Sequence, residues 1–291
     1  MTSLTLSDGR RLDVMVSGEA HHLPLLFHHG TPGSRHQFEL VRREAHEHDL
    51  RLVTWSRPGY GASERSPGRS VADAAADAEA VLDLIGADSC LTAGWSGGGG
   101  GPHALACGAL LPERVRAVLC IAGVAPYDAD GLEWLAGMGE DNLEEFGAAL
   151  EGEAALRPWL GAARSELAQI NGDQISASMS SLLPPVDVAA LTGDFAADLA
   201  TSIREAVSAG VDGWLDDDLA FTRSWGFDLD DLVVPTSIWQ GSEDLMVPFA
   251  HGAWLAARLP HATRHLEQGE GHVSITAGAF GRMLDELVDL A

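Results

Sequence analysis

The serine Ser96 and the five consecutive glycines at residues 97–101 constrain the fold of this chain more than any other stretch of its sequence. Each glycine costs roughly 0.5–1 kcal/mol relative to alanine inside a helix or strand, so a run of five needs a structural reason. The preceding residues, 90–95, form an apolar run that predicts a buried strand, and residues 102–111 predict a helix. The pattern therefore predicts a tight strand-to-helix turn that presents Ser96.

Three other roles of a glycine-rich stretch fit the neighbouring residues less well. A dinucleotide-binding turn is normally followed by an acidic residue at the end of the next strand. Here the next predicted strand ends in Ile121-Ala122-Gly123. A phosphate-binding P-loop needs a lysine, and all 18 basic residues of this chain are arginines. A flexible linker would not explain the strand before the glycines and the helix after them.

The overall composition limits the classes of protein to consider. The chain has 291 residues, 46% of them hydrophobic, which is enough for one large α/β domain or two smaller ones. Its formal net charge of −25 argues against nucleic-acid binding, because phosphate backbones need a basic surface. The N-terminal residues lack an apolar stretch of signal-peptide length, and the three cysteines give no disulfide framework. We therefore expect a cytoplasmic location.

Strand and helix patterns alternate through residues 22–123, which predicts a parallel sheet covered on both faces, after an N-terminal β-hairpin. Residues 126–227 show helical patterns without a strong strand, and they contain 19 acidic residues but only 4 arginines. The strand–helix alternation returns in residues 228–291. We predict a core of residues 1–125 and 228–291, and a helical cap of residues 126–227 over the strand ends. The uncharged stretch 89–112 is interpreted as buried strand, loop and helix, with no membrane span.

The residues around Ser96 match the pattern G-x-S-x-G, in which a strained turn exposes a nucleophilic serine. Such a serine needs a base and an acid that orients the base. Asp244 follows the predicted strand 236–240, and His272 lies between another predicted strand and the last helix. We predict that Ser96, Asp244 and His272 form a catalytic triad. The backbone amides of Thr31 and Gly97 are predicted to bind the oxyanion.

Five stretches together resemble the α/β-hydrolase family, and the resemblance extends over essentially the whole chain. They are His29-Gly30-Thr31-Pro32-Gly33, Ser56-Arg57-Pro58-Gly59-Tyr60-Gly61-Ala62-Ser63, the turn around Ser96, Gly241-x-x-Asp244-x-x-Val247-Pro248 and Gly271-His272. The resemblance implies a mostly parallel eight-stranded sheet flanked by helices, with an inserted helical cap. It also implies that the loop after Ser56 braces the active-site loops, and that the Thr31–Pro32 peptide bond is cis. The stretch at residues 57–63 matches epoxide-hydrolase-like and esterase-like members of the family. Epoxide hydrolases and haloalkane dehalogenases carry aspartate at the nucleophile position, whereas this chain has Ser96, so the resemblance implies a serine hydrolase.

The sequence thus predicts a carboxylesterase-type serine hydrolase that cleaves a small-molecule ester or lactone through an acyl-enzyme on Ser96. It predicts no cofactor and no metal. Three alternatives stay open: an aminopeptidase similar to proline iminopeptidases, a ligand receptor without activity, and carbon–carbon or haloperoxidase-like chemistry at the same triad. Homodimer formation is also left open.

Three further expectations concern the cap, the pH dependence and the glycines. The acidic residues of the cap are interpreted mainly as a solvated surface. The alternatives are that they disfavour anionic substrates or bind an amine, as the cap carboxylates of proline iminopeptidases do. The tryptophans Trp134, Trp159, Trp214 and Trp225 are interpreted as packing residues, with a substrate pocket as the alternative. Activity is expected to rise as His272 loses its proton near pH 6.5. The glycines at 99–101 are expected to allow close packing at the start of the next helix.

Overall fold

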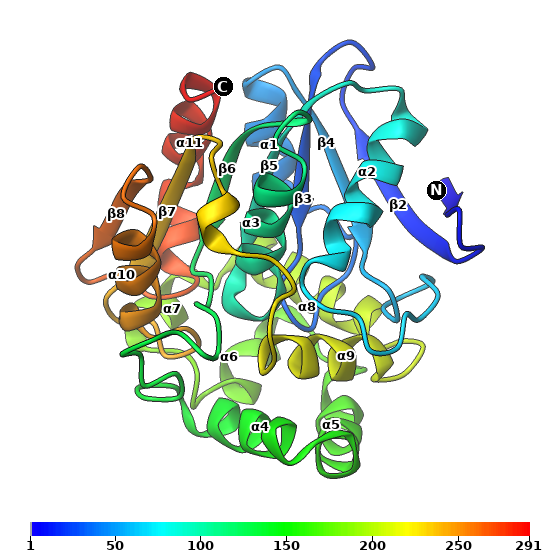
Figure 1. The fold of residues 1–291 in the computed structure, drawn as a ribbon. Coiled ribbons are helices and arrows are strands. Elements are labelled where there is room, and N and C mark those ends of the chain that lie inside the picture. Colours follow the sequence, from blue (N-terminus) through cyan, green and yellow to red (C-terminus); the bar gives the residue numbers. More distant parts are fainter. Residues whose placement is uncertain (1) are drawn as a thin grey trace.

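An eight-stranded β-sheet crosses the computed structural model, which describes residues 2–291 (Figure 1). The strands are β1 (Thr2–Thr5), β2 (Arg11–Ser17), β3 (Leu23–His28), β4 (Leu50–Ser56), β5 (Cys90–Trp95), β6 (Val115–Ile121), β7 (Thr236–Gly241) and β8 (Thr263–Glu267). Their order in the sheet is β1-β2-β4-β3-β5-β6-β7-β8. β1 and β2 form the predicted hairpin and pair antiparallel. β2 also pairs antiparallel with β4, and all the remaining neighbours are parallel. The predicted mostly parallel eight-stranded sheet is confirmed.

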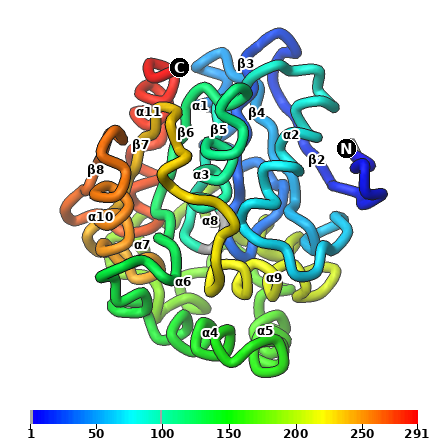
Figure 2. The backbone as a smooth tube through the Cα atoms, viewed as in Figure 1, coloured from blue at the N-terminus to red at the C-terminus, as the bar shows by residue number. Residues whose placement is uncertain are grey.

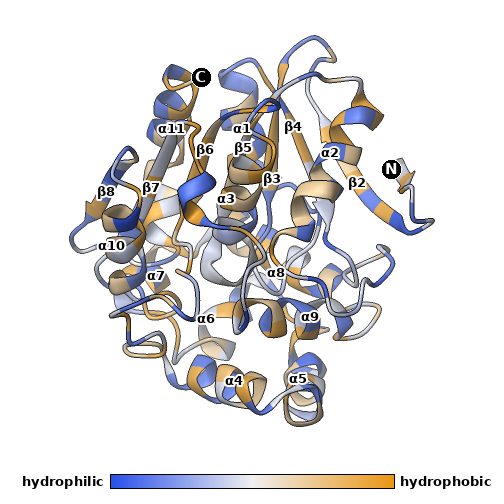
Figure 3. Ribbon diagram, viewed as in Figure 1, coloured by the Kyte–Doolittle hydropathy of each residue, from blue (hydrophilic) through white to orange (hydrophobic). Residues whose placement is uncertain are grey.

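The central strands are buried on both faces, which explains why they read as continuous apolar runs. Every residue of β5 is buried, and in β3 only Leu23 is partly exposed. Successive side chains point to opposite faces: Leu25 belongs to one hydrophobic cluster and Leu26 to the other. Figure 3 shows the hydrophobic colouring along these strands. The sheet therefore separates two cores.

Helices cover both faces of the sheet. One core includes side chains of α1 (Glu39–Glu47) and α11 (Ser274–Asp289). The other includes side chains of α2 (Asp73–Ile85), α3 (Gly101–Leu110) and α10 (Phe249–Arg258). Each parallel strand of the centre is thus connected to the next through a helix or a longer helical stretch, as parallel pairing requires.

Residues 122–235 connect β6 to β7 and contain no strand, and their helices gather at one end of the sheet (Figures 1 and 2). These helices are α4 (Glu140–Glu151), α5 (Glu153–Leu167), α6 (Ile175–Ser178), α7 (Pro185–Ala190), α8 (Gly193–Ala206) and α9 (Asp212–Phe221). We call this stretch the helical insertion. Its position brings α4, α5 and α9 together beyond the turn that follows β5. No helix of residues 2–291 has the length and apolar character needed to cross a membrane.

Candidate active site

Ser96 follows β5 directly and begins a single π-helical turn, Ser96–Gly100, that leads into α3. Its backbone φ is 81°, in the left-handed region that residues with a Cβ rarely adopt. Such a conformation costs of order 1–3 kcal/mol and persists only where the surrounding structure imposes it. The sharp turn leaves Ser96 partly exposed and lining two cavities.

The glycines around Ser96 are required by close backbone packing. A Cβ on Gly94 would overlap the carbonyl group of Gly100, and a Cβ on Gly100 would overlap the backbone of Trp95. A Cβ on Gly101 would lie 2.5 Å from the Cα of Gly123, in the turn after β6. The close packing expected at the helix start is therefore confirmed for Gly100 and Gly101. The expectation for Gly99 lies outside the residues whose surroundings the structure describes, as does Gly98.

Asp244 and His272 are in direct contact. The Nδ1 atom of His272 lies 2.8 Å from Oδ2 of Asp244, and both side chains are buried. The Asp244 carboxylate also accepts hydrogen bonds from the amides of Met246 and Val247, at 2.8 Å each, and from the side chain of Gln240. These donors fix the carboxylate, and the carboxylate fixes the imidazole ring. The other ring nitrogen of His272, Nε2, has no hydrogen-bond partner among the described residues, and His272 and Ser96 line the same cavity.

The environment of His272 raises its pKa above the ordinary value of 6.5. Burial opposes this change, because it disfavours the charged imidazolium. The charge of Asp244, its hydrogen bond and the more distant charge of Asp187 outweigh the burial. The pKa of His272 therefore lies above the reference value that the sequence alone suggested.

Thr31 and Gly97 line the larger of the two cavities together with Ser96. The loop after β3 approaches the serine closely: a Cβ on Gly30 would lie 2.9 Å from the Cβ of Ser96. Gly97 is equally confined, because a Cβ there would overlap the side chain of Val247. The Thr31–Pro32 peptide bond is cis, as the resemblance implied. The structure thus brings both predicted oxyanion residues to the wall of the serine cavity.

A buried ion-pair network holds the loop that contains Thr31. Arg57 donates to the carbonyl oxygens of His29 and Gly30 and to Oγ1 of Thr31. Its guanidinium also pairs with Asp217 of α9, at 2.7 Å, and Thr31 donates to the same carboxylate oxygen at 2.8 Å. These contacts confirm that the loop after Ser56 braces the loop after β3. They also connect that loop to the helical insertion.

Asp187, in α7 of the helical insertion, was not recognised from the sequence. Its fully buried carboxylate accepts three backbone hydrogen bonds at the start of α11: from His272 at 2.8 Å, from Val273 at 2.9 Å and from Ser274 at 2.8 Å. Gly271 must be glycine here, because a Cβ would overlap this carboxylate. Asp187 therefore fixes the backbone that carries His272. No local pattern in the sequence signals this contact, since 85 residues separate the two side chains.

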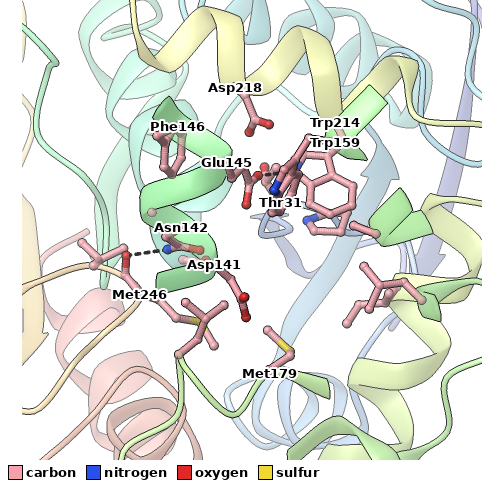
Figure 4. A pocket seen from close by; sticks show the side chains of 18 of the residues that line it. Thr31, Asp141, Asn142, Glu145, Phe146, Trp159, Met179, Trp214, Asp218 and Met246 are labelled. Atoms are coloured by element: carbon pink, nitrogen blue, oxygen red, sulfur yellow. Dashed lines mark hydrogen bonds between the residues drawn. The ribbon is translucent and has the colours of Figure 1, made fainter. Parts of the chain in front are cut away.

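The larger cavity has a volume of about 200 Å³ and lies between Ser96 and the helical insertion. Figure 4 shows its wall, with Glu145 and Phe146 on α4 and Trp214 and Asp218 on α9. Of the four tryptophans that were expected to pack the insertion, Trp159 and Trp214 line this cavity, which is where the pocket alternative would place them. Trp134 and Trp225 are buried in the core.

The interpretation of the acidic insertion as a solvated surface is wrong for five of its residues. Glu145, Asp187, Asp216, Asp217 and Asp218 are all buried. Amino-acid composition cannot distinguish a buried carboxylate from an exposed one, because the partners lie far away in the sequence. Arginines pair with Asp216 and Asp217, and backbone amides of residues 272–274 donate to Asp187. In residues 2–291, no group of three or more His, Cys, Asp or Glu side chains is arranged to hold a metal ion.

Three features of this structure are typical of the α/β-hydrolase class. They are a parallel sheet covered on both faces, a strained serine between strand and helix, and an Asp–His pair on two later loops. A comparison with protein families agrees. Residues 24–278 match the family described as "alpha/beta hydrolase fold", and the chain belongs to this family.

Individual known proteins are also similar to this chain. A non-heme chloroperoxidase of Streptomyces lividans is 28% identical over 156 residues, which are 53% of this chain and 56% of that protein. Among solved structures, an α/β-hydrolase fold protein from Nakamurella multipartita has a TM-score of 0.71 at 23% identity, covering 99% of both chains. An enol-lactonase from Burkholderia xenovorans LB400 has a TM-score of 0.64 at 16% identity, covering 99% of this chain and all of that one. At these identities the structural similarity shows a shared fold.

Proposed function

We propose that this protein is a serine hydrolase that cleaves small carboxylic esters or lactones through an acyl-enzyme on Ser96. The observation that carries the proposal is the buried pair of Asp244 and His272. The Nε2 atom of His272 has no hydrogen-bond partner among the described residues, and His272 lines the same cavity as Ser96. An imidazole held at Nδ1 by a carboxylate and free at Nε2 is arranged to accept a proton from a hydroxyl group.

In the proposed reaction, Nε2 of His272 accepts the Ser96 proton while Ser96 Oγ attacks the substrate carbonyl. The amides of Thr31 and Gly97 stabilise the resulting oxyanion. The imidazolium then donates its proton to the leaving alcohol, and the acyl group stays on Ser96. A water molecule, deprotonated by His272, attacks the acyl-enzyme and releases the acid. Asp244 keeps the imidazole in the required tautomer throughout.

The test is a series of p-nitrophenyl esters of increasing acyl length, assayed with the wild-type protein and with Ser96→Ala. We expect turnover by the wild type, labelling of Ser96 by a fluorophosphonate, and loss of both in the variant. Removal of the triad serine alone costs about 10⁶-fold in kcat in a well-studied protease. Full esterase activity of Ser96→Ala would refute the proposal. A single stoichiometric release of nitrophenol without turnover would instead favour a ligand receptor.

A second candidate is haloperoxidase-like chemistry, favoured by the names of two similar proteins. One is the Streptomyces chloroperoxidase, and the other is a bromoperoxidase from Bacillus anthracis with a TM-score of 0.69 at 17% identity, covering 99% of both chains. In this case hydrogen peroxide would replace water in the attack on the acyl-enzyme, which releases a peracid and restores Ser96. Water and hydrogen peroxide as attacking groups are distinguished by measuring peracid formation from acetate esters with and without hydrogen peroxide.

A further inference from the structure

Three consecutive aspartates of α9 are buried, and only two of them have a cationic partner. Asp216 pairs with Arg65 at 2.8 Å. Asp217 pairs with both Arg57 and Arg69. Asp218 is fully buried, and no N–H or hydroxyl group of residues 2–291 donates a hydrogen bond to it. Its side chain interacts instead with another carboxyl, that of Glu145. Buried carboxylates are normally paired with a cation, so the absence of one beside Asp218 calls for an explanation.

Asp218 lies beside a second buried carboxyl, that of Glu145 on α4. The indole nitrogen of Trp214 donates to Glu145 at 2.5 Å. Burial raises the pKa of Glu145 to about 7, and burial together with the Glu145 charge raises the pKa of Asp218 well above its ordinary value. Two close carboxyl groups without a cation retain a proton between them, because both cannot be ionised at low cost. A cation placed beside the pair would replace that proton.

Both carboxyl groups belong to the wall of the cavity that contains Ser96 (Figure 4). Asp141 and Glu166 line the same cavity, and its described lining residues include no arginine or histidine. The rings of Trp159 and Trp214 lie edge to face in this wall, with centroids 6.1 Å apart. Aromatic faces and desolvated carboxylates are the groups that bind organic ammonium ions in proteins. The cavity thus combines negative charge and aromatic surface next to the nucleophile.

We propose that this cavity binds the cationic ammonium group of an ester substrate, with Glu145 and Asp218 as its counter-ion. The inference rests on the proposed function, because Ser96 lines this larger cavity as well as the smaller one that it shares with His272. It narrows the substrate class to esters or lactones that carry a protonated amine. The lack of a cationic partner distinguishes Asp218 from its neighbours Asp216 and Asp217 on α9, whose charges are already compensated by arginine.

The test uses two pairs of esters that differ in charge but hardly in shape. 2-(Dimethylamino)ethyl butyrate is compared with 3-methylbutyl butyrate, and methyl 4-(dimethylamino)butanoate with methyl 5-methylhexanoate. The two pairs place the cation on the alcohol side and on the acyl side. We expect kcat/KM to favour the cationic member of at least one pair by about tenfold or more, which corresponds to about 1.4 kcal/mol. Asp218→Asn and Glu145→Gln should each remove most of this preference.

Asp194→Asn is the matched control, because Asp194 is an exposed aspartate in the first turn of α8 and does not line the cavity. It should keep the wild-type preference. The inference is refuted if both pairs are hydrolysed with the intrinsic reactivity ratio of the free esters, or if Asp218→Asn and Glu145→Gln, folded by circular dichroism, keep the wild-type preference. The inference would also be refuted if Asp194→Asn lost the preference for the cationic ester to the same extent, because the negative charge of the whole surface would then be its cause.

A binding experiment separates this inference from the proposed hydrolysis. Ser96→Ala is titrated calorimetrically with protonated N,N-dimethylbutylamine, and so is the double variant Ser96→Ala/Asp218→Asn. We expect saturable binding only to the first. Binding without turnover of any ester by the wild type would refute ester hydrolysis and support the cation site. Turnover of neutral esters without amine binding would refute the cation site and support hydrolysis.

Discussion

The three hydrogen bonds of Asp187 allow a quantitative prediction about how the helical insertion supports His272. Replacing Asp187 by alanine leaves the amides of His272, Val273 and Ser274 without their acceptor. Loss of a side chain that caps a helix costs about 0.5–2 kcal/mol, and a buried donor left unpaired costs about 1–3 kcal/mol. Because water can enter part of the vacated space, we expect Asp187→Ala to lose about 3–5 kcal/mol of unfolding free energy.

Asp187→Asn separates the loss of charge from the loss of side-chain volume. Asparagine keeps one acceptor oxygen for Val273 and Ser274 but presents an amide group to the N–H of His272. The expected destabilisation is therefore smaller, about 1–3 kcal/mol. The charge of Asp187 helps to raise the pKa of His272, so its removal should lower that pKa. The acid limb of the kcat/KM profile should move to lower pH.

Urea denaturation and a pH–rate profile with p-nitrophenyl butyrate measure these two effects. Asp194→Asn, an exposed aspartate of the neighbouring helix α8, is the control and should change neither quantity appreciably. Our reasoning would be refuted if Asp187→Ala stayed within about 0.5 kcal/mol of the wild type, the usual range of neutral surface substitutions. An acid limb of Asp187→Asn that stayed in place or moved to higher pH would refute the electrostatic part.

Three further predictions follow from the site and its surroundings. First, the kcat/KM of the wild type should rise with pH through a midpoint above 6.5, because the base form of His272 is needed and its folded-state pKa is raised; a midpoint at or below 6.5 would contradict the contribution of its carboxylate neighbours. Second, Gly101→Ala should destabilise the fold by about 1–3 kcal/mol in urea denaturation, since the added methyl group would press on Gly123; an unchanged midpoint would argue against close packing there. Third, the unfolding free energy should fall as pH rises from about 4.5 to 7, because the unfolded chain releases the Glu145 proton near 4.5 and the folded protein only near 7. Asp218→Asn should flatten this dependence, and a wild-type stability that rose steadily over that range, or a slope unaltered by the substitution, would count against a shared proton.

The fold was largely predictable because its determinants are local. A strand buried on both faces must be apolar along its whole length, and β5 was found between the same residues, Cys90 and Trp95, that the sequence indicated. The turn at Ser96 was predictable for a similar reason, since strand, serine and glycines are contiguous. The helix after it begins at Gly101, one residue before the prediction, and the missing Cβ of Gly101 leaves room for Gly123.

The predicted site residues could be selected from the sequence because each follows a recognisable strand. The parallel sheet brings the carboxyl ends of those strands to one edge, so Ser96, Asp244 and His272 lie in the same region. The orientation of these side chains depends on other contacts. The hydrogen bonds that orient Asp244 come from the turn after β7, and those that fix the start of α11 come from Asp187 in the helical insertion.

The sequence by itself determined the parallel sheet, the strained serine turn and the identity of the residues presented at the strand ends, because contiguous residues encode each of them. Only the tertiary structure decided which acidic residues of the insertion are buried and what each one faces. Asp216, Asp217 and Asp218 are chemically identical and adjacent in the chain, yet two pair with arginines and the third faces the serine cavity. That difference depends on distant segments that pack against α9. Arginines keep the buried Asp216 and Asp217 as anions, and Asp218 is left beside the carboxyl of Glu145, without a cation.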